Sequence, residues 1–323
     1  MSLKDIQKKY GGAIVSPSFI MEREKVVIPV SPVFDQALGG GIPEGTWVIF
    51  SGLPKCGKTT TILQICANAQ AMGKKIFYFN IEGRLKKRDL LGIHNLKIDS
   101  ELLHIISSNE DKIYSGEEFL DMATQIIKDK ENKGCVLVID STSSLCPTNE
   151  LTTEISPSLR ATAPKMLAHF FKQMGQIVPI MDTTAIMIQH LVTNTSGYGA
   201  KYNEDGGLWA QYQVDIKIRA HGKETKWLEN DKQIGQVVTW DILTSALGTP
   251  PSTIESYIRY GYGVDEVMET VGLASDLGVI KVGGSWFTFE DFKIQGKDNL
   301  CNHLRNNPDM VAKINSKLKE MLI

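Results

Sequence analysis

The stretch SGLPKCGKTTT at residues 51–61 narrows the possible folds of this chain more than any other part of the sequence, because it contains G-x-x-x-x-G-K-T. An apolar, β-rich run at 46–52 precedes it, and a run with helical spacing follows at 58–73. Between a strand and a helix, such a loop turns backbone N–H groups onto phosphate oxygens, and the helix adds its positive N-terminal end. A chance glycine-rich turn would not need these flanking elements. The pattern therefore predicts a nucleotide-phosphate site in an α/β fold.

The residues of this loop have separate predicted roles. The Lys58 ammonium can reach the β- and γ-phosphates of ATP, and the Thr59 hydroxyl can bind Mg²⁺. Asp140 ends the apolar run at 135–141, where a carboxylate would hold the same ion directly or through water. A strand-end aspartate that caps a turn is the simpler alternative. The residues expected to bind ATP are Gly52, Leu53, Pro54, Lys55, Cys56, Gly57, Lys58, Thr59 and Thr60.

ATP hydrolysis also needs a group that activates water, and Ser141, which follows Asp140, is not an acid. The strand expected at 74–82 ends in Glu82. If that strand neighbours the phosphate-loop strand, Glu82 points into the same crevice, because ligands of open α/β sheets lie beyond the C-terminal strand ends. The strand expected at 184–190 ends in Gln189 and His190, and either could touch the γ-phosphate. A solvated glutamate and a satisfied polar pair remain the plainer alternatives.

The order of elements predicts one mostly parallel sheet. Strands at 46–52, 74–82, 102–108, 135–141 and 184–190 alternate with helical stretches, which favours a parallel sheet covered on both faces. Three further strands follow without helices between them and are expected as antiparallel additions at a sheet edge: 214–220, 235–244 and 255–261. The C-terminal part is predicted as a helix, a hairpin and a helix pair split near Pro308: 264–278, 279–291 and 297–322.

The bulk composition sets limits on partners and location. The formal net charge is −2, so contacts to nucleic acid need local basic patches. The five cysteines form no C-x-x-C pair, which indicates reduced thiols and no metal cluster. Apolar runs stay shorter than the roughly 18 residues of a membrane span, and the start, MSLKDIQKKYGG, lacks the apolar core of a signal peptide. A cytoplasmic protein without membrane contact is expected.

With these residues in place, the chain resembles the RecA family of recombinases, including its phage UvsX branch. The resemblance rests on the order phosphate loop, strand-end Glu82, strand-end Asp140-Ser141 and strand-end His190. It extends through VSPVFDQALGGGIPEGTWVIFSGLPKCGKTTT, LCPTNELTTEISPSLRATAPKM, GGLWAQYQVDIKIRA and GLASDLGVIKVGGSWFTF, almost the whole chain. It implies a RecA-like core at 33–262, a short N-terminal segment at 1–32 and a small α+β C-terminal lobe at 263–323.

The resemblance also implies a function. Members of this family are DNA-dependent ATPases that use ATP and Mg²⁺, form helical filaments on single-stranded DNA, and promote pairing and strand exchange with homologous duplex DNA in recombination and repair. Glu82 matches the family's catalytic glutamate, Asp140 its Mg²⁺ aspartate and His190 its γ-phosphate sensor, with Lys58 in the phosphate loop. Mediator and single-strand-binding proteins are possible further partners.

Two segments match the family's DNA-binding loops, at 152–162 and 191–208. Both are rich in small polar residues, and the second is too polar to pack and too long for a plain connection. Basic side chains could contact phosphates and aromatic ones could stack on bases. The candidates are Arg160, Lys165, Tyr198, Lys201 and Tyr202. Surface loops without this function are the alternative.

Some positions depart from the family pattern. Only about ten residues precede Gly11, where the family usually has a longer N-terminal helix. Thr244 and Ala246 stand where the family has two basic residues that reach the neighbour's ATP. A potassium ion, or one of Lys223, Lys226 and Lys232, could replace their charge, although a solvated basic loop is the simpler interpretation. No clear equivalent of the aromatic residue that stacks on adenine is found, and Lys86 or Arg88 could stack there instead.

Two other functions remain open at this stage. One is a RecA-fold ATP-binding mediator or regulator without strand exchange, which the uncharged Thr244 and Ala246 would suit. The other is a P-loop kinase of a small molecule, which would need an arginine-rich lid that the sequence does not offer. DNA-stimulated ATP turnover separates the recombinase from the kinase, and joint-molecule formation separates it from the mediator.

Overall fold

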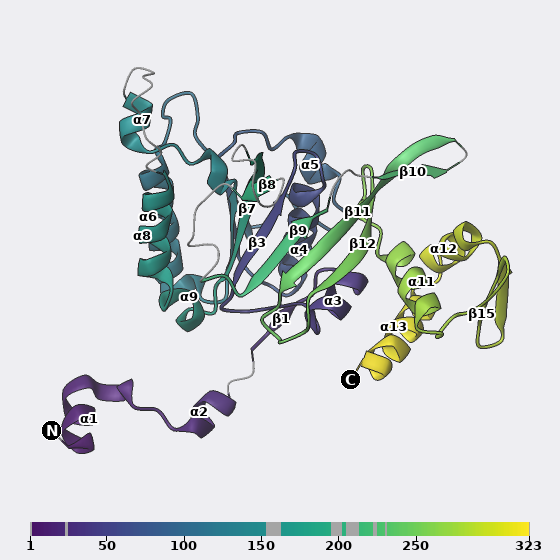
Figure 1. The fold of residues 1–323 in the computed structure, drawn as a ribbon, viewed down its shortest axis with the longest axis horizontal. Helices are drawn as coiled ribbons and strands as arrows, with labels where there is room; N and C mark the ends of the chain where they lie inside the picture. Colours follow the sequence, from purple (N-terminus) through teal and green to yellow (C-terminus); the bar gives the residue numbers. More distant parts are fainter. Residues whose placement is uncertain are drawn as a thin grey trace.

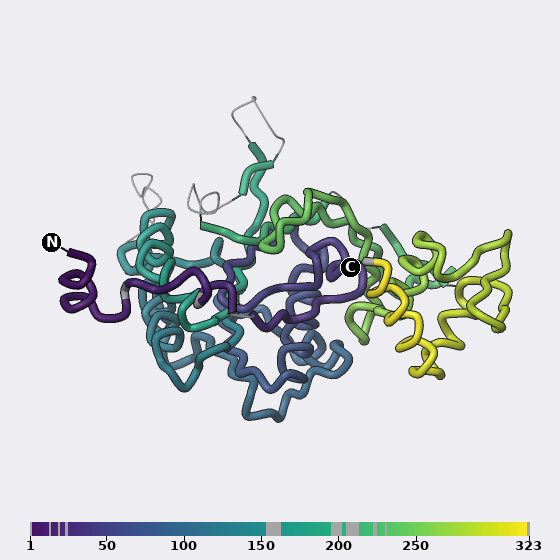
Figure 2. The backbone as a smooth tube through the Cα atoms, turned by 90° about the horizontal axis from the view of Figure 1, so that it is seen from below, coloured from purple at the N-terminus to yellow at the C-terminus, as the bar shows by residue number. Residues whose placement is uncertain are grey.

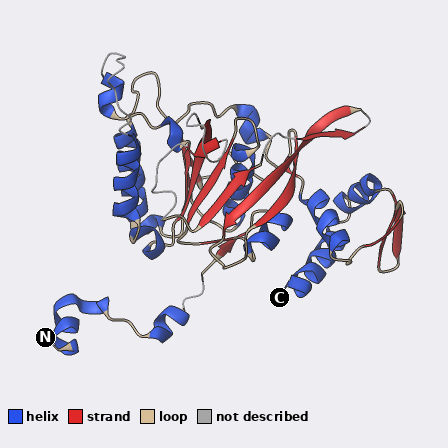
Figure 3. Cartoon of the chain, viewed as in Figure 1, coloured by secondary structure: helices blue, strands red, loops and turns tan. Residues whose placement is uncertain are grey.

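The computed structural model describes residues 2–22, 25–152, 163–194, 202–204, 213–221, 225–229 and 231–322. A large twisted sheet with helices against both of its faces makes up the body, and a smaller cluster of helices and short strands lies at the C-terminal end (Figures 1 and 3). The N-terminal helices α1 (Leu3–Tyr10) and α2 (Pro17–Met21) lie apart from the sheet in Figure 1, and Figure 2 shows the N-terminus at one end of the molecule. Helix α1 has no buried residue.

The main sheet runs in the order β13-β12-β11-β9-β3-β7-β6-β4-β5. From β9 to β5 all neighbours are parallel, whereas β11, β12 and β13 add antiparallel pairs at one edge. The strands are β3 (Trp47–Gly52), β4 (Ile76–Asn80), β5 (Leu103–Ile106), β6 (Val136–Asp140), β7 (Thr184–Thr193), β9 (Ile216–Ala220), β11 (Lys232–Thr244), β12 (Ser252–Arg259) and β13 (Gly263–Val264). Off this path, β8 (Tyr202–Glu204) pairs with β7 and β10 (Thr225–Glu229) with β11.

Two apolar cores follow from the two-residue period of the strands. On β3, Val48 and Phe50 face one core, while Trp47 and Ile49 face the other. Helix α4 (Lys58–Ala71) contributes to the first core, and α6 (Gly116–Lys128) and α8 (Ala163–Met174) to the second. A sheet buried on both faces needs continuous apolar strands, which is why the β3, β6 and β7 sequences alternate little between apolar and polar residues.

The remaining elements before the C-terminal part are short. They are the helices α3 (Pro32–Leu38), α5 (Lys87–Leu91), α7 (Thr148–Thr152) and α9 (Ile177–Ile180), the 3₁₀ turns η1 (Gly11–Ala13), η2 (Lys130–Asn132) and η3 (Thr142–Ser144), and the strand pair β1 (Val27–Ile28) with β2 (Ile42–Pro43). The expected parallel sheet with helices on both faces is confirmed.

One expectation about the sheet is wrong in detail, and one condition set for Glu82 is not met. The strand expected at 214–220 is not an antiparallel addition, because β9 pairs in parallel with β3 and antiparallel only with β11. The strand that leads to Glu82 does not neighbour the phosphate-loop strand, because β7 and β6 lie between β3 and β4. Strand order depends on crossover connections and packing between distant segments, which residue periodicity does not encode.

The C-terminal elements enclose a third apolar core. They are α11 (Glu266–Asp276), β14 (Lys281–Gly283), β15 (Trp286–Phe289), β16 (Phe292–Gln295), α12 (Lys297–Arg305) and α13 (Pro308–Leu322). Leu300, Leu304 and Ile314 are fully buried in it. The expected helix pair is present, and Pro308 begins its second helix, where a proline needs no backbone donor. The expected hairpin at 279–291 gains a third strand, β16.

Candidate active site

The phosphate loop joins β3 to α4, as expected. Gly57 has φ of +87° and forms the N-cap of α4, and a Cβ on it would lie 2.3 Å from Ile258 Cδ1. A side chain at this position would therefore meet both the left-handed backbone and the neighbouring strand β12. The glycine lets the loop close tightly over the start of the helix, which leaves the backbone N–H groups of its first turn available for an anion.

Lys58 lies inside this loop. Its Nζ donates hydrogen bonds to the carbonyl oxygens of Gly52, at 3.0 Å, and Leu53, at 2.8 Å, and the residue is buried. These neutral acceptors orient the ammonium without neutralising its charge. The lysine is thus placed to meet phosphate oxygens at the mouth of the loop.

The two predicted Mg²⁺ ligands lie together. Thr59 Oγ1 donates a hydrogen bond to Asp140 Oδ2 at 3.2 Å, and the Tyr78 hydroxyl donates to the same oxygen. Burial raises the pKa of Asp140, and the hydrogen bond from Tyr78 opposes that rise. A hydroxyl and a carboxylate oxygen suit Mg²⁺, whose other ligands would come from phosphate and water. The described residues hold no cluster of three or more His, Cys, Asp or Glu side chains able to bind a metal.

Glu82 is held by side chains from three segments. Ser141 Oγ donates to Glu82 Oε1 at 2.8 Å, His190 Nε2 contacts the same oxygen, and Arg84 lies 3.7 Å from Oε2. Burial raises the pKa of Glu82, but the hydrogen bonds from His190 and Ser141 outweigh it and leave the pKa below its ordinary value. The group is therefore a carboxylate at neutral pH, and it can accept a proton.

The Thr59–Asp140 pair and Glu82 all line one cavity of about 170 Å³, which is called the nucleotide cavity from here on. It is lined by Thr59, Thr60, Asn80, Glu82, Arg84, Leu85, Asp89 and Asp140. Glu82 reaches it although β4 is not adjacent to β3, because all the parallel strands end at the same edge of the sheet. His190 lies in register with Gly52, the first glycine of the phosphate loop.

The segment after His190 forms a ribbon that sequence patterns did not predict. Strand β7 continues to Thr193 and pairs antiparallel with β8, so that Leu191 lies opposite Glu204 (Figure 1). Glu204 accepts hydrogen bonds from Ser51, at 3.1 Å, and Arg219, at 2.7 Å, and its other oxygen lies 2.5 Å from Lys217 Nζ. Burial raises the pKa of Glu204, but these two cations outweigh it and lower the pKa. Glu204 thus connects the ribbon to the strand that carries the phosphate loop.

The predicted DNA-binding residues lie mostly outside the described residues: Arg160, Tyr198 and Lys201 belong to this group. Lys165 is exposed on α8, and Tyr202 lies in β8 opposite Thr193. The expected loop at 191–208 is therefore partly a strand pair. Figure 2 shows the ends of β7 and β8 projecting from the body.

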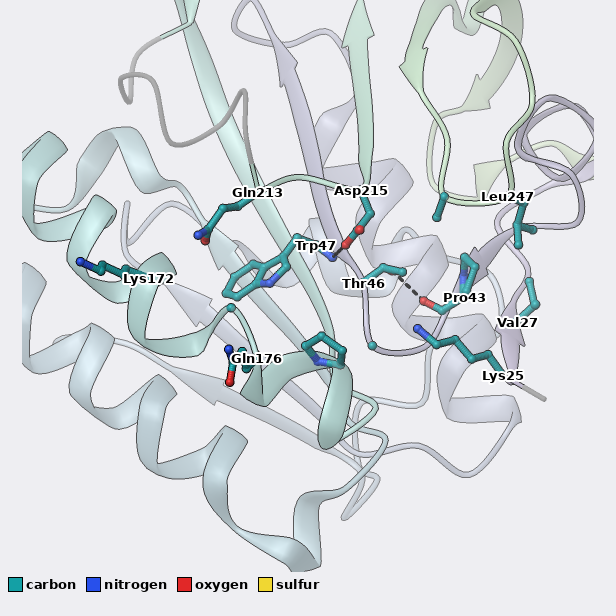
Figure 4. Close-up of a pocket in the computed structure, with 14 residues that line it drawn as sticks. Lys25, Val27, Pro43, Thr46, Trp47, Lys172, Gln176, Gln213, Asp215 and Leu247 are labelled. Carbon is teal, nitrogen blue, oxygen red and sulfur yellow. Dashed lines mark hydrogen bonds between the residues drawn. The ribbon is translucent and has the colours of Figure 1, made fainter. Parts of the chain in front are cut away.

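The positions proposed for interface charge lie apart from the nucleotide cavity. Thr244 ends β11, and Ala246 lines a larger cavity of about 850 Å³ at the opposite end of β3, beside Trp47 and Lys25 (Figure 4). Lys226 and Lys232 are exposed on β10 and β11, whereas Lys223 lies outside the described residues. Lys86 and Arg88, proposed for adenine, stand at α5 beside Asp89, which lines the nucleotide cavity.

A strand–glycine loop–helix unit, a buried lysine, a Thr–Asp pair and a carboxylate beyond the strand ends define the class of P-loop ATPases. Family models narrow the class: the RecA N-terminal domain matches residues 1–265, and the RecA C-terminal domain matches residues 268–323. The chain belongs to the RecA family.

Known relatives agree with this result. The chain is 28% identical over 322 residues to Protein RecA of Ruminococcus albus, covering 97% of this chain and 77% of the relative. It is 27% identical to Protein RecA of Nitratiruptor sp., covering 100% and 92%, and 29% identical to that of Mycobacterium avium, covering 100% and 90%.

Family membership gives the general function. The chain is an ATP-binding and DNA-binding recombinase with DNA-dependent ATPase activity, which acts in recombination and repair and forms filaments. This favours the recombinase over the small-molecule kinase. None of the helices formed by the described residues is both long and apolar enough to cross a membrane.

Proposed function

We propose that this RecA-family ATPase hydrolyses ATP through Glu82 and senses the γ-phosphate through His190. The observation that carries this proposal is the shared oxygen Glu82 Oε1, which contacts both His190 and Ser141 at the edge of a cavity lined by Thr59 and Asp140. Glu82 takes the proton of the attacking water. His190 and Ser141 fix the orientation of its carboxylate.

ATP is held by residues 52–60 in this proposal. Lys58 binds the β- and γ-phosphates, and Thr59 and Asp140 are the protein ligands of Mg²⁺. The ion supplies charge neutralisation on the phosphates when it is bound. Tyr78 orients the Asp140 carboxylate by a hydrogen bond, as side chains outside a metal's ligand set commonly do.

Nucleotide and DNA sites are connected through β7. His190 contacts Glu82 and stands directly before the ribbon of β7 and β8, so a phosphate that binds His190 competes with Glu82 for its ring. That exchange would change the ribbon and the segment at 191–208, as in other phosphate switches. We propose Arg160, Lys165, Tyr198, Lys201 and Tyr202 as contacts of single-stranded DNA.

Further partners and location follow from the same proposal. The filament would form on single-stranded DNA and take up homologous duplex DNA, with mediator and single-strand-binding proteins as additional partners. The five cysteines are free, which suits a reducing, cytoplasmic setting. The proposed units are a segment at 1–32, a core at 33–262 and a lobe at 263–323.

Replacing Glu82 with Gln tests the assignment. Glu82→Gln should keep nucleotide binding and reduce DNA-dependent hydrolysis by about 10²-fold or more, because an amide cannot take the proton. Lys58→Ala is the contrasting variant and should lose nucleotide binding. Binding of a fluorescent ATP analogue and phosphate release on single-stranded DNA give the two readouts. Wild-type turnover in Glu82→Gln would remove Glu82 from the mechanism.

Joint-molecule formation between single-stranded and homologous duplex DNA then separates recombinase from mediator. A recombinase forms joints with ATP, whereas a mediator binds ATP and DNA without forming them. The Thr244→Lys/Ala246→Lys double variant restores positive charge at the two positions where the family has basic residues that reach the neighbouring subunit's ATP. Its ATP turnover is compared with that of the wild type. An unchanged wild-type rate in that variant would show that these positions do not limit turnover.

A further inference from the structure

The charge balance of the nucleotide cavity is unfavourable for ATP. Three carboxylates line it, from Glu82, Asp89 and Asp140. Arg84 is the one cation among the described residues that line it. Lys58, proposed to bind the β- and γ-phosphates, lies in the loop and is not among the residues that line this cavity. A polyphosphate entering such a site needs further positive charge close to its terminal group.

We propose that Arg84 is a catalytic cation of this ATPase, which leaves Glu82 on nucleotide binding and contacts the terminal phosphate of the same subunit's ATP. The inference rests on the proposed role of Glu82 and adds to it a second, charge-stabilising residue. No other described residue that lines the cavity can provide this charge in cis.

The contact between Arg84 and Glu82 is suited to such an exchange. The nitrogen–oxygen distance is 3.7 Å, which is longer than a direct charge-assisted hydrogen bond, and 83% of the Arg84 side chain is exposed. Glu82 does not depend on this contact for its position, because Ser141 and His190 both hold its other oxygen. The guanidinium can therefore move to a phosphate with little loss.

Movement of Arg84 from Glu82 to the phosphate changes the surroundings of both side chains. While Arg84 lies beside Oε2, that oxygen faces a cation and is a poorer proton acceptor. Once the guanidinium binds phosphate oxygens, Oε2 is open to the attacking water. The planar guanidinium donates two parallel hydrogen bonds to a phosphate, which a lysine cannot do.

The chemical step is hydrolysis. The water oxygen forms a bond to the γ-phosphorus, and the bond from phosphorus to the β–γ bridging oxygen breaks. ADP leaves with that electron pair, and the water proton passes to Glu82. Arg84 neither gains nor loses a proton: it stabilises the negative charge on the phosphoryl oxygens as the transfer proceeds.

Lys133 provides a control outside the nucleotide cavity. Its side chain is 57% exposed and lies 3.3 Å from Asp182, and neither residue is among those that line the cavity. It has the same charge as Arg84 and also faces a carboxylate, but it contacts no proposed catalytic or binding group. Arg84 and Lys133 therefore differ chiefly in the carboxylate that each one faces.

The experiment measures kcat and KM for DNA-dependent ATP hydrolysis in Arg84→Ala, Arg84→Lys and Lys133→Ala. Arg84→Ala should lower kcat by about 10²-fold, the usual effect of a lost transition-state donor, with a much smaller change in KM. Arg84→Lys should recover only part of the rate, and Lys133→Ala should keep the wild-type kcat. Millimolar guanidinium ion should partly restore turnover of Arg84→Ala and leave Lys133→Ala unchanged.

The outcomes separate this inference from the role of Glu82. A wild-type kcat in Arg84→Ala, or an equal loss in Lys133→Ala without guanidinium rescue, overturns the inference even if Glu82→Gln is inactive. A normal rate in Glu82→Gln together with a guanidinium-rescued loss in Arg84→Ala overturns the role of Glu82 alone. Unchanged thermal unfolding of each variant, which is expected for exposed side chains, shows that the rates report on catalysis.

Discussion

At the scale of single residues, the Tyr78 hydroxyl orients Asp140, the carboxylate proposed to bind Mg²⁺. Tyr78 is fully buried on β4, and its hydroxyl donates to the same oxygen of Asp140 that accepts from Thr59. Burial is the main reason why the pKa of Tyr78 lies well above its usual value, so the hydroxyl keeps its proton and remains a donor. The bond counteracts the effect of burial on Asp140 and favours its charged form.

Replacing Tyr78 with Phe should therefore weaken Mg²⁺-dependent nucleotide binding. The expected loss is about 10-fold or more in the apparent Mg²⁺ affinity, the range for groups that orient a metal ligand. A Mg²⁺ titration of nucleotide binding measures it, with Tyr114→Phe as a control away from the cavity. An unchanged Mg²⁺ midpoint in Tyr78→Phe would mean that the hydroxyl has no part in metal binding.

The proposed site residues Lys58, Thr59, Glu82, Asp140 and His190 could be selected from the sequence, because each was expected in the loop or at the end of a strand and parallel strands end at one edge. His190 lies within β7, which continues to Thr193, in register with the end of β3. It missed Tyr78, although the two-residue period places this residue on the strand face that packs against α4. Its partner Asp140 lies 62 positions away. Contacts of that kind depend on strand order, which local patterns leave open.

At the scale of elements, β7 and β8 form a ribbon within the segment at 191–208. The ribbon begins next to His190, which lies in register with the first glycine of the phosphate loop. Glu204 on β8 contacts Ser51, which is 153 positions away on the phosphate-loop strand. Lys217 and Arg219 on β9 hold its two oxygens. Glu204 therefore joins β8 to β3 and β9 through its side-chain contacts.

Changing Glu204 to Gln should weaken the coupling between nucleotide and DNA. The stimulation of turnover by single-stranded DNA should fall about 5-fold or more, the lower range of coupling between sites, while turnover without DNA changes less. Glu229→Gln is the control, because Glu229 on β10 pairs with Arg259 on β12, at 3.8 Å, and is not among the residues that line the nucleotide cavity. Equal DNA stimulation in Glu204→Gln and wild type would show that β8 does not transmit the signal.

At the scale of the whole molecule, buried carboxyl groups lie where the C-terminal helix α11 packs against β12 and α3 of the core. Glu269 on α11 is almost fully buried, accepts a hydrogen bond from Ser256 on β12 at 2.6 Å, and lies 3.5 Å from the backbone nitrogen of Val33 on α3. Burial raises the pKa of Glu269 to about 7 and that of Asp35 on α3 also to about 7. Both groups therefore keep a proton in the folded state under mildly acidic conditions.

These raised pKa values make the folded protein less stable as the pH rises. Between the ordinary glutamate pKa and about 7, the unfolded chain releases the proton of Glu269 while the folded protein retains it. Unfolding is therefore favoured progressively over this interval, and the loss is complete above pH 7. For one such group the total amounts to about 3 kcal/mol as an upper bound.

A neutral side chain at this position should remove that part of the pH dependence. Glu269→Gln should show a smaller difference between the free energies of unfolding at pH 5.5 and pH 8 than the wild type, and higher stability than the wild type at pH 8. Urea denaturation at both pH values measures this, with the exposed Glu255→Gln on β12 as the control that keeps the wild-type difference. A wild-type pH difference in Glu269→Gln would mean that Glu269 is already ionised in the folded protein, so that the junction holds a charge rather than a proton.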